Sequence, residues 1–357
     1  MRTPLMQHGG QLRALGNHFG IDPATLIDFS ANINPDGPPT SVIATLQAAL
    51  LRPATLGEYP DIEEELLRES LAAYAGVPAT NVVVANGFVP ILGATIQALP
   101  VRRCILPVPA FNEYRNVLER HGIEVEPVVL QPSSEFHYDF DTLAGKDGDA
   151  ILMANPQNPT AVFTEQAGLV GFVELCAKRR CYVLLDEAFI DYAQEGSLTG
   201  FVRQFPNLII FRSLTKFFGM PGLRVAYALA CDGLRARIEK FLSPWSISTL
   251  ASIAAIEAVK DTAYMERGVI KNEIRRNELA GGLEALGLRV VRGRANYLLF
   301  QSRNAAQLWK ELIVEHRLVL RLCDSFESLS EDFLRTAVRN EENNFLLLSS
   351  LRKAARP

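Results

Sequence analysis

The chain has 357 residues, a formal net charge of −4 and a sequence pI of about 5.9. Because a single core stops growing at roughly 250–300 residues, this length predicts about two domains. The acidic balance excludes nucleic acid and an anionic membrane as the main partner, and no apolar run approaches the ~20 residues that span a bilayer. Five cysteines without a CxxC pair, and no apolar leader in Met1–Gly10, predict a soluble cytoplasmic protein without a metal site.

The middle of the chain alternates short apolar runs with amphipathic stretches. The runs lack polar alternation, which is typical of strands covered on both faces by helices. They are Asn81–Ala85, Cys104–Pro107, Ala150–Ala154, Tyr182–Leu185, Leu208–Phe211 and Val225–Ala230. A helix is predicted over Ile62–Ala75, with Asp61 as N-cap, Glu64 at the capping-box position and Gly76 as the stop. The alternation predicts an α/β domain with a mainly parallel sheet, which binds ligands at the carboxyl ends of its strands.

The pattern changes after Leu242. A long helical segment over Ile247–Leu286, interrupted near Asp261, leads into shorter elements. These are strands at Leu288–Val291, Tyr297–Phe300, Leu318–Leu322 and Leu334–Val338, and helices over Ala305–His316 and Glu341–Lys353. We therefore predict an N-terminal arm and part of the small domain in residues 1–45, a large domain in residues 46–242 and a small α+β domain in residues 243–357.

Polar side chains follow three of the predicted strands. Asp186 ends an apolar strand, Asn158 lies in a turn with two Asn-Pro steps, and a loop rich in Gly and Pro follows a third strand. That loop carries Ser213, Thr215, Lys216 and Arg224. Alone, these features indicate a helix N-cap, a tight turn and a solvated basic loop. Together they supply what an electron-sink cofactor needs: an amine for covalent attachment, an acid for the ring nitrogen, a donor to the phenolic oxygen and a phosphate cup.

Longer motifs extend this set over nearly the whole chain, from His8 to about Asn343. They are His8-Gly9-Gly10, Asp28 to Pro35, Tyr59-Pro60-Asp61, Asp186 to Asp191, Ser213 to Phe217, Pro244-Trp245-Ser246 and Gly293 to Leu299. With these motifs the chain resembles the pyridoxal-phosphate (PLP) enzymes of fold type I, the aspartate-aminotransferase superfamily, and within it the histidinol-phosphate aminotransferase group. The likeness is greatest to the L-threonine-O-3-phosphate decarboxylases of cobalamin biosynthesis. It implies a mainly parallel seven-stranded sheet flanked by helices in the large domain, and a homodimer with shared active sites.

The resemblance implies a set of cofactor contacts. Lys216 would bind PLP covalently, Asp186 would pair with the ring nitrogen, and Asn158 would donate to the phenolic oxygen. Phe111 would stack on the ring. The cofactor phosphate would be bound by the loop Gly87, Phe88 and Val89, by Ser213, Thr215 and Arg224, and by Tyr59 of the partner subunit.

For the substrate, the resemblance implies two anion sites. Arg335 corresponds to the arginine that meets the substrate carboxylate, and Asn158 would also face the substrate. His8, Asn32 and Arg321 are the candidates for the phosphate of the substrate. Arg339 either helps Arg335 or is an exposed arginine of the final strand.

Two segments depart from the pattern of the family. The phosphate loop is Gly87-Phe88-Val89-Pro90, in which Phe88 and Val89 offer no hydroxyl and Pro90 lacks an N–H. The backbone N–H groups of Phe88 and Val89 would then serve the phosphate. Ala161 follows the Asn-Pro turn where glycine is usual.

Three functions stay open on these residues. The first is PLP-dependent decarboxylation of a phosphorylated amino acid, with L-threonine O-3-phosphate giving 1-aminopropan-2-ol O-phosphate, and L-serine phosphate as a near alternative. His8-Gly9-Gly10, Phe189 in place of the usual tyrosine of the aminotransferases, and Pro244-Trp245-Ser246 favour it. The second is a transaminase for histidinol phosphate or a similar amine with 2-oxoglutarate. The third is a non-catalytic PLP-binding module, which only the altered phosphate loop favours.

Overall fold

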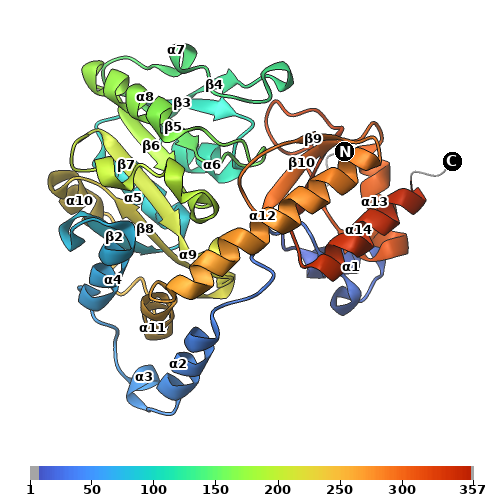
Figure 1. Cartoon of the computed structure of the whole chain (residues 1–357). Coiled ribbons are helices and arrows are strands. Elements are labelled where there is room, and N and C mark those ends of the chain that lie inside the picture. The colour runs from blue at the N-terminus through green and yellow to red at the C-terminus, as the bar shows by residue number, and fades with distance from the viewer. Residues whose placement is uncertain (1–7, 355–357) are drawn as a thin grey trace.

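A computed structural model describes residues 8–354 of the chain. The prediction that Met1–Gly10 contains no apolar leader falls mostly on residues 1–7, which lie outside the described part. Figure 1 shows a larger α/β body and a smaller body, connected by the long helix α12 (Thr262–Ala285). Within residues 8–354, no helix is long and apolar enough to cross a membrane.

The larger body contains the predicted mainly parallel sheet of seven strands, in the order β2-β8-β7-β6-β5-β3-β4. Its strands are β2 (Val82–Asn86), β3 (Arg103–Val108), β4 (Glu124–Val129), β5 (Asp149–Ala154), β6 (Tyr182–Asp186), β7 (Leu208–Ser213) and β8 (Val225–Leu229). The strands from β7 to β4 are parallel to one another, and β8 runs antiparallel to both of its neighbours. The six strands expected from apolar runs are confirmed, with ends shifted by one or two residues.

Helices cover both faces of this sheet, which explains the unbroken apolar runs. Alternate strand residues enter two separate clusters: Ile151 and Leu185 face one side, while Leu152 and Leu184 face the other. The first side is covered by α4 (Glu65–Ala75), α8 (Gln166–Lys178) and α11 (Thr249–Ala258), and the second by α5 (Phe88–Ala98), α6 (Asn112–Arg120) and α10 (Asp232–Glu239). The remaining helices of this body are α2 (Thr40–Leu50), α3 (Ala54–Gly57), α7 (Phe140–Leu143) and α9 (Leu214–Phe217).

The smaller body is built on an antiparallel sheet of four strands in the order β12-β13-β10-β9. These are β9 (Arg289–Val291), β10 (Tyr297–Gln301), β12 (Arg321–Leu322) and β13 (Phe333–Ala337), and next to them β1 (Ile27–Asp28) pairs in parallel with β11 (Leu318–Val319). Helices α1 (Leu12–Phe19), α13 (Ala305–His316) and α14 (Glu341–Ala354) share its core with the end of α12. Residues near the start of the chain thus pack on residues near its end.

The domain boundaries near residues 45 and 242 stay predictions. Helix α2 begins at Thr40 and packs on α11, which follows residue 242. Val42 of α2 and Ala254 of α11 are fully buried in the same core cluster as the large sheet. These two helices therefore pack with the larger body.

Three details of the predicted elements were wrong. The helix expected from Ile62 begins at Glu65, because Glu64 has a left-handed backbone (φ 50°) and does not form a capping box; Asp61 instead accepts from the Glu65 backbone N–H at 3.0 Å. The expected strand Leu318–Leu322 is two strands that separate at Leu320 and pair with different partners. Strand β4 was missed because it is a largely exposed edge strand without a continuous apolar run.

Candidate active site

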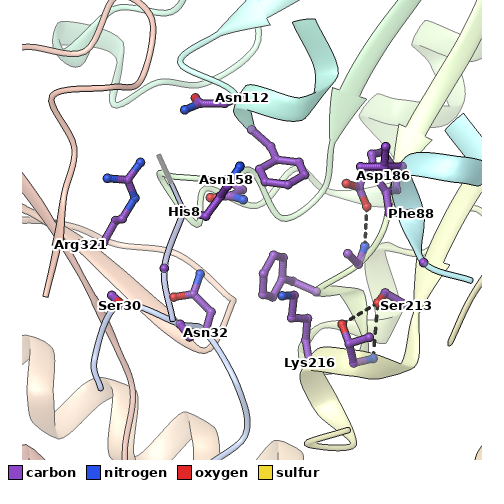
Figure 2. A pocket seen from close by; sticks show the side chains of 18 of the residues that line it. His8, Ser30, Asn32, Phe88, Asn112, Asn158, Asp186, Ser213, Lys216 and Arg321 are labelled. Carbon is purple, nitrogen blue, oxygen red and sulfur yellow. Dashed lines mark hydrogen bonds between the residues drawn. The ribbon is translucent and has the colours of Figure 1, made fainter. Parts of the chain in front are cut away.

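A cavity of about 270 Å³ lies at the carboxyl ends of the parallel strands, between the two bodies. Every predicted site residue lines it except Tyr59 and the alternative candidate Arg339. Figure 2 shows Asp186 and Ser213 on one side, Arg321, Ser30 and Asn32 on the other, and Lys216 near the open space between them. We call the end with Lys216, Asp186 and Ser213 the proximal end, and the end with His8, Asn112 and Arg321 the distal end. The strand-end motifs thus lie together, although their roles toward a ligand stay predictions.

Lys216 is placed by a tight turn after β7. The Ser213 side chain caps the short helix α9, and the Lys216 backbone carbonyl accepts from the Asn34 N–H at 3.0 Å. Burial, and then the nearby cations Arg335 and Arg224, lower the pKa of the Lys216 amine to about 8, while Asp186 acts in the opposite direction. A lysine with such a pKa has a substantial neutral fraction near physiological pH and can act as a nucleophile.

Asp186 is the last residue of β6 and is buried. Its carboxylate accepts from the Tyr114 hydroxyl at 2.5 Å and from the Ala188 backbone N–H at 2.9 Å. Burial raises the pKa of Asp186 to about 6, and the two hydrogen bonds and Lys216 act against that rise. The carboxylate is therefore held in a fixed position and is ionised above about pH 6, as an anion that pairs with a cationic ring nitrogen must be.

Donors to an anion gather beside Lys216. The hydroxyls of Ser213 and Thr215 are 2.8 Å apart, and Arg224 follows with a left-handed backbone (φ 60°). Gly87 has φ 91°, and a Cβ there would lie 3.1 Å from Nη2 of Arg224, so the guanidinium approaches the Gly87 backbone closely. Helix α5 begins at Phe88, directly after this glycine.

The unusual Phe88-Val89-Pro90 sequence is compatible with an anion site at this helix terminus. The first N–H groups of a helix have no partner within the helix and point at an incoming anion. Pro90 lies in the first turn, where its missing N–H removes no intrahelical hydrogen bond. Phe88 packs its ring against Phe111, Tyr114 and Phe211, with centroids 6.3, 5.6 and 5.4 Å away.

The Asn-Pro turn connects the site to the small domain. Arg335 donates to Oδ1 of Asn158 at 2.5 Å and to the backbone carbonyl of Ser30 at 3.1 Å. Because Oδ1 of Asn158 is occupied, its Nδ2 is the group left to donate to a ligand. Ala161, in the usual glycine position, has φ 63°, a conformation that costs a non-glycine residue about 1–2 kcal/mol.

Two arginines lie side by side toward the distal end. Arg321 and Arg335 are direct partners on the antiparallel strands β12 and β13, so their side chains share one face of the sheet. Only 1% of Arg321 and 6% of Arg335 is exposed. Arg321 donates to the Ser325 hydroxyl and to the Leu322 carbonyl, each at 2.5 Å. Two buried guanidinium groups at one place favour binding of anionic groups.

The arm residues reach the cavity from the other side. The Gly10 N–H donates to the Ser30 hydroxyl at 2.9 Å, and a Cβ at Gly9 would overlap the Ser30 carbonyl oxygen at 2.2 Å. Only glycine permits this close approach. The close packing of the arm against Ser30 brings His8 into the cavity. There its Nε2 lies 3.1 Å from Oε1 of Glu113, and its ring contacts that of Phe111 edge-on.

Tyr59 lies away from the cavity of its own chain. It is 83% exposed and its ring lies 5.1 Å from that of Trp245. Its predicted contact with the cofactor phosphate of a second subunit stays a prediction. Arg339 is half-buried and does not line the cavity that the described residues form.

The sequence did not single out several residues that build this site. Tyr114 holds Asp186, Glu113 meets His8, the Ser30 carbonyl orients Arg335, and Asn112 and Phe326 line the distal end. Tyr114 follows the predicted ring-stacking residue Phe111 by one helical turn, and that spacing was the signal available for it. The others act through contacts between segments far apart in the chain.

The residues present fit PLP. The cavity is lined by the Lys216 amine with its lowered pKa and by the buried Asp186 carboxylate, which accepts from two donors. It is also lined by two hydroxyls, a guanidinium and the start of helix α5, which together form an anion site. These are the groups that bind the aldehyde, ring nitrogen and phosphate of that cofactor. Within residues 8–354, no group of three or more His, Cys, Asp or Glu side chains is arranged to hold a metal ion.

Fold and site together define an α/β enzyme of the PLP fold type I class. The chain belongs to the family Aminotransferase class I and II, whose model matches residues 24–351, and PLP is the cofactor of these enzymes. It is 33% identical over 356 residues to the threonine-phosphate decarboxylase of Salmonella typhimurium, covering 97% of this chain and 95% of the relative. It is 29% identical over 299 residues to histidinol-phosphate aminotransferase 1 of Cupriavidus pinatubonensis, covering 82% and 78%.

A solved structure also resembles the whole chain. The histidinol-phosphate aminotransferase of Clostridium acetobutylicum superposes with a TM-score of 0.86 and 28% sequence identity, covering 92% of this chain and 99% of that chain. The expected fold and family are thereby confirmed. Relatives of both activities resemble the chain, so the family identifies a PLP-dependent enzyme and leaves open the choice between lyase and aminotransferase.

Proposed function

We propose that the protein decarboxylates a phosphorylated amino acid, with L-threonine O-3-phosphate as substrate and 1-aminopropan-2-ol O-phosphate as product, in the synthesis of the cobalamin side chain. The observation that carries this proposal is the pair of buried guanidinium groups of Arg321 and Arg335. A substrate with a carboxylate and a phosphate on one short chain gives each arginine an anion. The 33% identity to a protein named threonine-phosphate decarboxylase supports the same choice.

At the proximal end, PLP when bound supplies an electron sink for the bond that breaks at the substrate Cα. Asp186 keeps a proton on the ring nitrogen through its carboxylate, which Tyr114 and the Ala188 N–H hold in place. Lys216 would attach the cofactor through its amine, and the same amine would carry a proton to the substrate Cα. Phe111 stacks on the ring, and Asn158 donates its Nδ2.

The cofactor phosphate is held beside Lys216. Ser213, Thr215 and Arg224 supply side-chain donors, and Gly87 allows the guanidinium to approach the backbone. The N–H groups of Phe88 and Val89 at the start of α5 replace the missing hydroxyl contacts. Together these groups would hold the cofactor phosphate in place.

The distal end decides which bond breaks. Arg321, His8 and Asn32 would bind the substrate phosphate, and this remote binding energy would orient the substrate so that its carboxylate is the group lost as CO₂. Arg335 meets the carboxylate and limits its rotation.

We also propose that the enzyme is a homodimer that acts in the cytoplasm. Large hydrophobic side chains are exposed close to Tyr59 in the sequence, among them Leu51 at 85% and Leu56 at 71%, and Trp245, whose ring contacts that of Tyr59, is 47% exposed. Exposed apolar patches of this kind mark protein–protein contacts. A second copy would cover them and bring Tyr59 to the cofactor phosphate of its partner. Sedimentation of the PLP-loaded protein tests this, and a monomer at micromolar concentration would refute the dimer.

The test of the activity is direct. Purified protein is incubated with PLP and L-threonine O-3-phosphate, and CO₂ and phosphorylated aminopropanol are measured by mass spectrometry. A parallel sample contains histidinol phosphate and 2-oxoglutarate, with glutamate as the readout. CO₂ without any keto acid supports the decarboxylase, whereas glutamate without CO₂ refutes it.

The second candidate is an aminotransferase for histidinol phosphate. The similarity to enzymes of that name in Cupriavidus pinatubonensis and Clostridium acetobutylicum favours it. Phe189, which lines the cavity and has no hydroxyl to offer the cofactor, favours the decarboxylase. L-serine phosphate, tested beside the threonine compound, separates the two phosphorylated amino acids.

A further inference from the structure

Phe326 contacts both arginines of the cavity. The guanidinium carbon of Arg321 lies 5.0 Å from the centroid of its ring, and that of Arg335 lies 5.9 Å from it. Phe326 is 5% exposed and lines the cavity. Contacts between a guanidinium and an aromatic ring within about 6 Å are attractive, so this ring helps to position both cations. Arg335 also lies over the Tyr297 ring, at 5.2 Å.

This contact offsets an unfavourable arrangement. Like charges directly opposite each other on antiparallel strands repel, and burial strengthens the repulsion. Arg321 and Arg335 are such a pair: burial, and to a smaller extent Arg335, lower the pKa of Arg321 to about 10 against the opposing effect of Cys323. Each guanidinium also has hydrogen-bond acceptors of its own, and the Phe326 ring adds a contact that the two cations share.

The loop that carries Phe326 is fixed to the other body of the molecule. It connects β12 to β13 over residues 323–332. Arg115 of helix α6 binds Glu327 through two hydrogen bonds of 2.8 and 2.7 Å, and Asn112 approaches the Ser325 hydroxyl at 3.5 Å. Residues on both sides of Phe326 are therefore held against α6, which also follows the ring-stacking residue Phe111.

We propose that Phe326 determines substrate length. By contacting both guanidinium groups from a loop anchored on α6, its ring fixes the separation of the carboxylate and phosphate sites, and selects substrates whose two anionic groups are separated as in an O-phosphorylated β-hydroxy amino acid. This inference rests on the proposed two-anion substrate. It adds to that proposal a residue that touches both anion-binding side chains and sets their spacing.

The experiment measures binding of unreactive two-anion ligands of graded length. 4-Phosphonobutyrate has as many atoms between its carboxylate carbon and phosphorus as threonine phosphate, 3-phosphonopropionate is one atom shorter, and 5-phosphonopentanoate is one longer. Isothermal titration of the PLP-loaded protein should show at least about tenfold tighter binding of 4-phosphonobutyrate than of the other two. Phe326→Leu and Phe326→Ala should reduce this preference to less than about threefold, and Phe326→Tyr, which keeps the ring, should retain it.

The outcomes separate this inference from the proposed function. No length preference in the wild type, or an unchanged preference in a folded Phe326→Leu protein with normal PLP absorbance, would overturn it. If Phe326→Ala does not fold, the leucine variant still decides the question. A wild type that shows the preference without decarboxylating threonine phosphate would refute the proposed reaction and keep the role of Phe326, whereas decarboxylation without a length preference would do the reverse.

Discussion

The two ends of the cavity are built in different ways. The proximal end comes from consecutive strand ends of one sheet, where Asp186 ends β6 and Ser213 ends β7, with Lys216 three residues further. The distal end joins three segments that are distant in the sequence: His8 of the arm, Asn112 of α6 and Arg321 of β12. Local geometry places the first set, and contacts between the two bodies place the second.

The electrostatics of the two ends differ as well. The proximal end pairs opposite charges, since Asp186 and Lys216 each favour the charged form of the other. Toward the distal end two cations are neighbours, and a ring contacts both. The proximal end thus contains a carboxylate beside its cations, whereas the distal arginines are neighbours of like charge, arranged for the anions that a substrate brings.

The largest expected effect tests the proximal end. Lys216→Ala should lower turnover by at least about 10⁴-fold, because the attached amine both holds the cofactor and carries the proton. The visible absorbance of bound PLP should also change to that of the free aldehyde. The exposed Lys178, paired with Glu174, provides the control, and Lys178→Ala should leave both readouts unchanged. Normal turnover in Lys216→Ala would show that another group binds PLP.

The next effect concerns Asp186 in the protein without PLP. Its pKa is raised by burial from 3.8 to about 6, so its favourable contribution to stability is complete below the ordinary pKa and is lost as pH rises through about 6. In the wild type, Asp186 should make the free energy of unfolding fall by about 3 kcal/mol between roughly pH 4 and 7, and Asp186→Asn should remove this fall. Urea unfolding at a series of pH values measures both proteins. The pKa of Asp149 is lowered through its ion pair with Arg103, so the contribution of Asp149 to the free energy of unfolding should rise with pH instead of falling. Equal slopes would contradict the assignment.

Arg321→Gln tests the distal end. It should lower kcat/KM for the phosphorylated substrate by about 30–100-fold, because charge-assisted hydrogen bonds to the phosphate are lost. The affinity for PLP should change by less than about twofold, since the change is remote from the cofactor. Arg339→Gln is the matched control and should have little effect, because Arg339 does not line the cavity of the described residues. Equal loss of substrate and PLP binding in Arg321→Gln would show that the two ends are not independent.

Tyr114→Phe should produce a smaller change at the proximal end. The hydroxyl stabilises the carboxylate of Asp186, so its removal should raise the pKa of Asp186 above about 6, by about one unit. The pH midpoint of the stability profile of the PLP-free protein would then move upward. In an Asp186→Asn background, Tyr114→Phe should leave the pH midpoint of the stability profile unchanged. A remaining shift of the midpoint would show that another group causes it.

The smallest expected effect concerns the ion pair that connects the distal loop to the larger body. Arg115 and Glu327 form a partly exposed ion pair between the two bodies, with side chains 29% and 38% exposed. Arg115→Gln should raise KM for the phosphorylated substrate by about two- to fivefold and change stability by less than about 1 kcal/mol. Glu327→Gln should match it, and the double variant should add nothing further. Additive effects would mean that the loop is not held by this pair.

Much of the proximal end could be predicted before any tertiary structure was considered. A parallel sheet gathers the carboxyl ends of its strands at one edge, so Asp186, Asn158 and Lys216 had to lie near one another once their strands were recognised. The same logic failed for β4, whose exposed residues lack the apolar run of a buried strand. It failed again at Leu320, where the residues of one predicted strand belong to two different sheets.

The distal end depended on the tertiary structure. Nothing near Phe326 in the sequence shows that its ring contacts two arginines, because Arg335 reaches it through a strand pairing with Arg321. Likewise, Glu113 and His8 are separated by about a hundred positions and meet only because Gly9 allows the arm to lie against Ser30.

The sequence by itself determined the fold class, the cofactor and the residues at the strand ends, because apolar periodicity and short motifs are local properties of the chain. The tertiary structure decided which side chains hold those residues, as Tyr114 holds Asp186, and how far apart the two anion sites lie. Such distances are set by packing between segments remote in sequence, and a pattern along one chain does not contain them.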